Sequence, residues 1–260
     1  DMHSWPTALE GGLFLLMMAL GVEALSLLAQ VQKANEMAMD LNARELARLR
    51  IVLAIIGATF LTVATAILMR WMIRGALWQG WTVLVLAVLF GGIFYYLCQA
   101  VPLLSSFRAL AEVLLFVVIP PALAFFIQST DFHRLLTLVV LPFVGAYLAY
   151  LLLVALMDYG TDQHLGHKTI ATEIGWEKTM VYHNALILLA YLLFALIAIL
   201  DFPWFLLWPV FLTLPIGMLE IWLMERVRRG GKPLWRVMQA ATASIYFIPM
   251  YLLAFAFWIR

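Results

Sequence analysis

Long apolar stretches separated by short polar links dominate the sequence. Because a transmembrane helix needs about 20 mostly apolar residues, eight stretches are long enough to cross a bilayer. We expect these spans at residues 8–31, 51–72, 77–99, 106–128, 135–157, 181–200, 204–224 and 240–259. Links as short as Asp201-Phe202-Pro203 favour antiparallel neighbouring helices. The pattern therefore predicts an all-α, polytopic membrane helical bundle with eight transmembrane helices.

Composition supports a membrane protein and argues against a soluble domain. The 260 residues are 65% hydrophobic and only 12% charged, which is far from the composition of soluble domains. The net charge of +1 gives no reason to expect a nucleic-acid partner. The single Cys98 lies within an apolar run and cannot form an intrachain disulfide. Membrane lipid is thus the one partner that composition implies.

Lysine and arginine positions predict the orientation. Successive links between spans lie alternately on the two sides of the membrane. Counted in this way, twelve of the 16 basic residues fall on one side and four on the other. Basic residues are enriched on the cytoplasmic side of membrane proteins. We therefore expect an integral protein of the bacterial inner (cytoplasmic) membrane, with both chain ends outside and the link after residue 157 in the cytoplasm.

Two cytoplasmic links carry the candidate chemistry, because each has a pair of acids four residues apart. The pairs are Glu36 with Asp40, after the first span, and Asp158 with Asp162, after the fifth. On a helix this spacing places both carboxylates on one face. Mg²⁺ prefers a few carboxylates together with waters and phosphate oxygens. The alternative interpretation is that both pairs are ordinary solvated helix ends.

Four further glutamates fall inside predicted spans. They are Glu10, Glu23, Glu112 and Glu220. Carboxylates within a membrane are costly and usually face a cavity or a polar partner. The simplest interpretation of Glu10, Glu23 and Glu220 is a protonated or interhelical hydrogen-bonded side chain.

The second acidic pair lies in a string that resembles a known motif. The string Asp158-x-x-x-Asp162-x-x-x-Gly166-x-Lys168-Thr169-Ile170-Ala171-x-x-x-Gly175 resembles the second acidic motif of the UbiA superfamily of intramembrane prenyltransferases. In addition, Phe107-Arg108-Ala109-Leu110-Ala111-Glu112 is similar to the Tyr-Arg-Gly-Leu-Gly-Glu stretch of the menaquinone-forming 1,4-dihydroxy-2-naphthoate polyprenyltransferases, with alanine in place of both glycines. That family has nine spans, with acidic motifs after the second and sixth. The resemblance thus implies that residues 1–260 form a single UbiA-like domain holding helices 2–9.

The resemblance also implies a function. In such a bundle, magnesium holds a polyprenyl diphosphate between the two acidic motifs, in a central cavity that opens toward lipid. Ionisation of the allylic C–O bond lets an aromatic quinone precursor attack the prenyl carbon, and the metal neutralises the departing diphosphate. The implied residues are Asp158 and Asp162 as catalytic metal ligands, Glu36 and Asp40 as ligands of the first motif, and Lys168, Arg108 and Tyr159 as substrate contacts.

The first motif departs from the family pattern, which reads Asn-Asp-x-x-Asp-x-x-x-Asp. Aligning its last two acids on Glu36 and Asp40 places Gln32 at the asparagine and Lys33 at the first aspartate. A cation at that position repels a bound metal ion. Starting the motif at Asn35 instead places Met39 where an acid belongs. Neither register is complete, so the first acidic motif is degenerate.

Three functional hypotheses remain open from the sequence. The first is an active, magnesium-dependent polyprenyltransferase that acts on an aromatic quinone precursor. The second is a homologue that has lost the chemistry and binds a lipid, quinone or pigment as a structural subunit of a larger membrane complex. The third is an unrelated transporter whose paired acids bind a coupling ion.

The orientation generates one prediction about the gene. Residues 1–7 contain no lysine or arginine, and the first predicted span then begins on the outside. We expect the upstream coding sequence to encode one more apolar span with a basic cytoplasmic end, which sequencing the full reading frame checks. A coding sequence without such an upstream span would instead indicate a genuine first helix with its amino terminus outside.

Overall fold

The protein is all-helical in its computed structural model. The described residues are 94% helical, and none of them forms a strand. The structure describes residues 5–36, 43–74, 77–99, 109–110, 112–122, 134–165, 169–200 and 203–258. The predicted all-α class is therefore confirmed for this part of the chain.

Four helices within the described residues are long and apolar enough to cross a membrane. They are Arg44–Ile73, Leu138–Met157, Trp176–Ile199 and Trp204–Arg228. These four correspond to the spans expected at 51–72, 135–157, 181–200 and 204–224. The other four expected spans stay predictions, as does the membrane side that each link faces.

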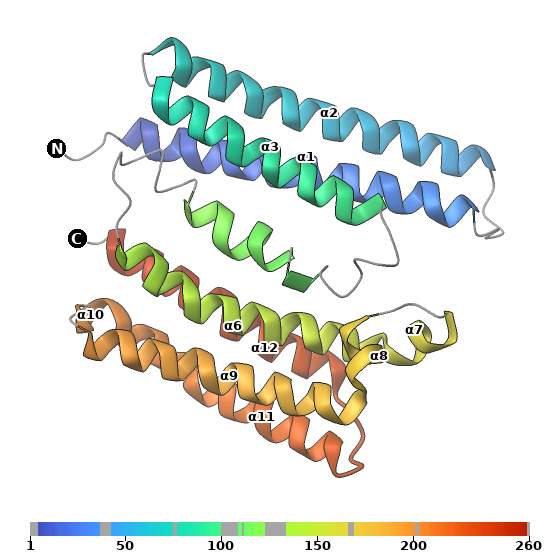
Figure 1. Cartoon of the computed structure of the whole chain (residues 1–260), viewed down its shortest axis with the longest axis vertical. Helices are drawn as coiled ribbons and strands as arrows, with labels where there is room; N and C mark the ends of the chain where they lie inside the picture. Colours follow the sequence, from blue (N-terminus) through green and yellow to red (C-terminus); the bar gives the residue numbers. More distant parts are fainter. Residues whose placement is uncertain are drawn as a thin grey trace. The chain divides into compact units, whose positions relative to one another are not determined.

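The chain divides into two compact units, and each is described by itself. The first unit comprises Asp1–Val101 and Leu114–Phe132. Its helices are α1 (Trp5–Glu36), α2 (Ala43–Ile73), α3 (Leu77–Gln99) and a π-helical turn, η2 (Leu114–Val118). Helix α1 packs lengthwise on α2 and also contacts α3 (Figure 1).

A glycine lets α1 and α2 approach closely. A Cβ atom added to Gly21 of α1 would lie 2.8 Å from Cγ of Leu61 on α2. Small residues permit this kind of close helix contact, which gains dispersion energy where lipid offers no hydrophobic driving force. The small size of Gly21 therefore lets the two helices touch at this position.

One end of the first unit holds a polar cluster around Glu10. The indole Nε1 of Trp71 donates to Oε2 of Glu10 at 3.0 Å, while Phe14 packs against the Trp71 ring with centroids 5.4 Å apart. Arg70 and Arg74 form ion pairs with the same carboxylate at 3.1 and 3.3 Å. The carboxyl group of Glu10 is therefore bound between helices, in agreement with the simplest interpretation of its sequence position.

The second unit comprises Pro102–Val113 and His133–Arg260. Its long helices are α6 (Arg134–Met157), α9 (Trp176–Ile199), α11 (Leu214–Arg228) and α12 (Trp235–Trp258). Helix α6 packs against α9 and α12, and α11 packs against the same two helices (Figure 1). Two short helices, α7 (Tyr159–Leu165) and α8 (Ile170–Ile174), connect α6 to α9.

The span expected at 204–224 is not one regular α-helix. A four-residue helix, α10 (Trp204–Leu207), is followed by the 3₁₀ segment η3 (Trp208–Thr213), and then by α11. Proline has no backbone N–H to donate, so it disfavours a helix interior and suits a helix start. Pro209 lies in η3, and Pro215 occupies the first turn of α11. The two prolines account for the change of helix type.

The close packing of α9 on α11 generates a prediction. The hydroxyl of Tyr191 donates to the Thr213 carbonyl at 2.8 Å, which pins the Tyr191 ring. A Cβ atom at Gly217 would lie 2.6 Å from that ring. We expect Gly217→Ala to lower the free energy of unfolding by about 1–3 kcal/mol because the interface becomes overpacked, measured by thermal unfolding in detergent.

Gly145→Ala in α6 is the matched control, because its added Cβ would make only an ordinary contact of 3.5 Å with the Leu186 carbonyl. Alanine favours a helix over glycine by about 0.5–1 kcal/mol, so this variant should unfold at the same or a slightly higher temperature. Equal melting of the two variants would contradict the packing argument.

Candidate functional site

The acidic pair of the second unit lies directly beyond the last residue of α6. The Asp158 amide still donates to the Val154 carbonyl at 3.2 Å, although the chain bends at this residue. The Asp162 amide in turn donates to the Asp158 carbonyl at 2.8 Å. The two aspartates therefore keep the one-turn backbone spacing that the sequence predicts, across a bend and not within one continuous helix.

The surroundings of the two aspartates differ. Asp158 is exposed, whereas Asp162 is partly buried in the first turn of α7. A carboxylate near a helix amino end is favoured by the partial positive charge of the unpaired N–H groups. The pair thus presents one solvent-facing acid and one more sheltered acid, with a helical turn between them.

Aromatic side chains pack beside this pair. Tyr159 meets Trp176, the first residue of α9, with ring centroids 5.5 Å apart at 63°. Trp176 in turn meets Trp235, the first residue of α12, at 5.9 Å and 89°. Both tryptophans pack on the buried core of Leu153, Leu156 and Met180 and their neighbours. The three rings form a partly buried aromatic row at the end of the unit that carries Asp158.

The sequence did not single out Trp176 or Trp235 as site residues. Tryptophan at the end of a span is typical of the membrane interface, so position alone could not separate them from other interfacial tryptophans. The two tryptophans form one row with Tyr159 because α7, α9 and α12, which begin at these three residues, have their first residues side by side. Only the tertiary structure reveals this row.

The segment between α7 and α9 is shaped by residues of the same motif. Thr169 and Thr172 form a capping box, in which the Thr169 amide donates to Oγ1 of Thr172 at 2.8 Å. Ala171 is fully buried. Gly175 joins α8 to α9 at φ 88° and ψ 154°, a conformation that is essentially restricted to glycine. Three motif positions therefore serve the local fold directly.

The link between α11 and α12 lies at the same end of the second unit (Figure 1), and the sequence around it is rich in basic residues. The carboxylate of Glu225 accepts from Arg228 at 2.9 Å and from Arg229 at 3.1 Å. The exposed basic residues of this region are Arg226, Arg228, Arg229, Lys232 and Arg236. One carboxylate offsets only part of this charge, so the region favours anionic groups nearby.

Several predicted site residues lie outside the described residues. These are Asp40, Arg108 and Lys168, while Glu36 ends α1 with its side chain outside the description. Of the predicted site residues, the structure therefore describes Asp158, Tyr159 and Asp162 together. The side chains of the first acidic motif lie outside the described residues. In the part of the chain that is described, no three metal-ligating side chains converge.

The residues present fit partial ligation of Mg²⁺. This ion usually keeps several waters and takes one or two carboxylates together with phosphate oxygens. Asp158 and Asp162 supply two carboxylates one turn apart. They would hold a metal only together with a phosphate-bearing ligand or a second acidic cluster.

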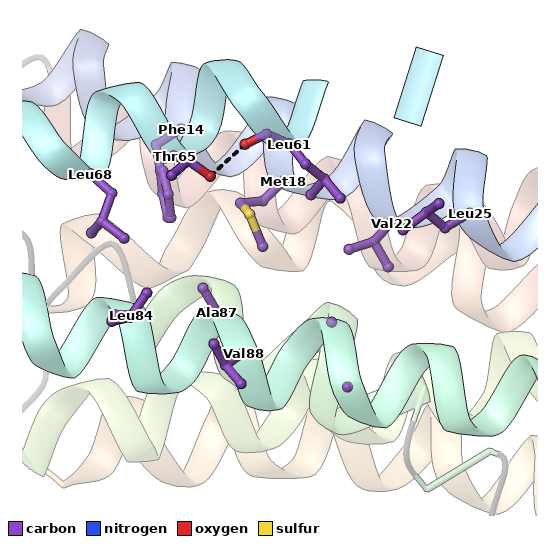
Figure 2. A pocket seen from close by; sticks show the side chains of 12 residues that line it. Phe14, Met18, Val22, Leu25, Leu61, Thr65, Leu68, Leu84, Ala87 and Val88 are labelled. Carbon is purple, nitrogen blue, oxygen red and sulfur yellow. Dashed lines mark hydrogen bonds between the residues drawn. The ribbon is translucent and has the colours of Figure 1, made fainter. Parts of the chain in front are cut away.

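The first unit contains an apolar cavity of about 460 Å³ between α1, α2 and α3. Side chains such as Met18, Val22 and Leu84 point toward it (Figure 2). Its one polar side chain, Thr65, donates its hydroxyl to the Leu61 carbonyl at 2.7 Å. With that hydroxyl satisfied, the cavity offers a hydrocarbon lining and suits an alkyl or isoprenoid chain.

The link between α8 and α9 generates a prediction. We expect Gly175→Ala to lower the free energy of unfolding by about 1–3 kcal/mol, because alanine is strained at φ 88°. Gly160→Ala in α7 is the control, since its added Cβ meets nothing within 4 Å. Thermal unfolding of both variants checks this, and an unshifted midpoint for Gly175→Ala would contradict the assigned backbone conformation.

Comparison with known proteins adds no assignment. No protein-family model matches the sequence, and no curated protein is significantly similar to it. The interpretation of the acidic pair therefore rests on its residues and their geometry.

Proposed function

We propose that this protein is an intramembrane prenyltransferase of the UbiA type. It would transfer a polyprenyl group from its diphosphate to an aromatic quinone precursor. The observation that carries the proposal is the one-turn backbone pairing of Asp158 and Asp162 at the end of an apolar helix, within a string that resembles the second acidic motif of that superfamily.

The charged residues have distinct roles in this proposal. Asp158 and Asp162 would hold Mg²⁺, with Glu36 and Asp40 as the ligands of the first motif. Lys168 and Arg108 would contact the diphosphate oxygens through charge-assisted hydrogen bonds. The metal, when bound, would neutralise negative charge on the leaving diphosphate.

The aromatic residues beside Asp158 support the same proposal, because ionisation of the allylic C–O bond leaves a carbocation. The face of an aromatic ring stabilises nearby positive charge. Tyr159, Trp176 and Trp235 provide such rings within the unit that carries Asp158. Tyr159 is accordingly the proposed aromatic contact for the substrate.

The alternative function is that of a binding subunit that has lost the chemistry. The observation that favours it is Lys33 at the place of the first aspartate of the first motif. A cation there opposes metal binding, whereas a bound lipid, quinone or pigment needs only the apolar cavity. Native mass spectrometry after gentle extraction tests it, because a subunit should retain stoichiometric partners and a lone monomer argues against it.

The experiment for the enzymatic function is a transfer assay. Purified protein is supplied with Mg²⁺, a radiolabelled allylic diphosphate and, in turn, dihydroxynaphthoate, hydroxybenzoate or homogentisate. We expect Asp158→Asn and Asp162→Asn each to lower turnover by about 10²–10³-fold, as the loss of one group that stabilises transition-state charge typically does. Glu177→Gln is the matched control, because Glu177 is an exposed acid of α9 outside the motif.

Lys33→Asp separates the two functions. If the degenerate first motif only limits an active enzyme, restoring the anion should strengthen metal binding and raise turnover at low Mg²⁺ concentration. Should neither the wild-type protein nor Lys33→Asp transfer a prenyl group to any acceptor, the enzymatic function is wrong.

A further inference from the structure

The second unit buries two ionisable side chains against each other, away from the acidic pair. His183 of α9 and Glu220 of α11 are both 0% exposed, and Nε2 of His183 lies 3.3 Å from Oε1 of Glu220. The other ring nitrogen, Nδ1, lies 2.8 Å from the carbonyl oxygen of Ala149 on α6. The contacts therefore connect three helices through one imidazole ring.

The depth of this pair can be judged from helix geometry. His183 follows Trp176, the first residue of α9, by seven residues. At 1.5 Å per residue, this places it about 10 Å along the helix axis from the aromatic row. Met180 and Met224, one turn from His183 and Glu220 respectively, are buried to about the same extent. The pair thus belongs to the packed interior of the unit.

The contact with Ala149 shows which ring nitrogen of His183 carries a hydrogen. A carbonyl oxygen can only accept, so Nδ1 of His183 must carry a hydrogen and donate it. A neutral ring then presents a lone pair at Nε2. An ionised carboxylate facing that lone pair would be repelled by it. One proton must therefore lie between Nε2 and Glu220, either on the ring as an imidazolium or on the carboxyl group.

Burial favours the carboxyl group. Charge-assisted N–H···O hydrogen bonds are about 2.7–2.9 Å long, and the 3.3 Å separation of Nε2 and Oε1 is longer, so no strong charge-assisted bond offsets the cost of burying an ion pair here. Oε2 of Glu220 is buried without a hydrogen-bond partner among the described residues. An ionised carboxylate has about four acceptor sites to satisfy, so leaving it in this state would be costly.

The buried threonine hydroxyls of this unit are committed to backbone carbonyls. The hydroxyl of Thr179 donates to the Gly175 carbonyl at 2.8 Å, and that of Thr242 on α12 donates to the Met238 carbonyl at 3.0 Å. Both hydroxyl hydrogens are therefore used within their own helices or caps. Burying an ion pair without further hydrogen bonds costs more than burying the neutral forms.

We propose that Glu220 is held as a neutral carboxylic acid that donates its proton to Nε2 of His183. The pair then forms an uncharged latch that links α6, α9 and α11 inside the membrane-spanning part of the second unit. This role is independent of prenyl transfer and needs no metal or substrate.

Infrared spectroscopy tests the protonation state directly. In a difference spectrum between wild type and Glu220→Gln, we expect the loss of a protonated-carboxyl C=O band that shifts in heavy water. Glu225→Gln is the matched control, because Glu225 pairs with Arg228 and Arg229 and should lose carboxylate bands instead. Loss of carboxylate bands in Glu220→Gln as well would overturn the proposal.

A second measurement covers the case in which Glu220→Gln does not fold. Solid-state NMR of wild-type protein with ¹⁵N-labelled histidine should show one ring, assigned through His183→Gln, as a neutral tautomer protonated at Nδ1. An imidazolium signal for His183 would overturn the proposal without any Glu220 variant.

Thermal unfolding gives an independent readout of the latch. Glu220→Gln retains the shape and offers an amide hydrogen to Nε2, so its midpoint should stay close to that of wild type. Glu220→Leu removes the donor and leaves Nε2 unsatisfied, so its midpoint should fall further. The reverse order, with Glu220→Leu the more stable of the two, would contradict the hydrogen bond.

Discussion

Hydrogen-bond satisfaction in an apolar setting is the constraint on which the rest of this structure depends. The interior of a bilayer offers no water to an unpaired polar group, so each one must find its partner within the protein. The helical backbone meets this need by itself. Side chains meet it in pairs: Glu10 is bound by Trp71 and by two arginines, and His183 and Glu220 lie against each other. Each of these contacts also joins neighbouring helices, so the partners that polar groups require help to decide how the helices pack.

The acidic pair lies at the end of a long apolar helix. Asp158 is the first residue beyond α6 and is exposed, and Asp162 follows in the first turn of α7. The capping box of Thr169 and the positive φ of Gly175 fix the course of the chain, while the two aspartates supply its charge. The same short string thus specifies a local fold and, in the proposed function, also supplies the metal ligands.

The charges of the first acidic motif distinguish the two proposed functions better than the shape of the binding surface does. A row of aromatic rings would serve a prenyl substrate and a bound quinone equally well. A metal-diphosphate site, in contrast, depends on anionic ligands, and Lys33 introduces a cation into the first motif. The balance between catalysis and binding therefore depends on a few charges at helix ends, and the helical fold is compatible with both.

The sequence by itself indicated where several of the long helices lie and how the acidic pair is spaced, because both depend on neighbours along the chain. The span expected at 77–99 coincides with α3, and the one at 135–157 differs from α6 by one residue. The tertiary structure alone decided which helices meet, and so joined Trp176 and Trp235 to Tyr159 and Glu220 to His183. The physical reason is that helices apolar on nearly all sides carry no polar stripe to mark their contact face. Partners tens of residues apart are then selected by close packing and by the pairing of the few buried polar groups.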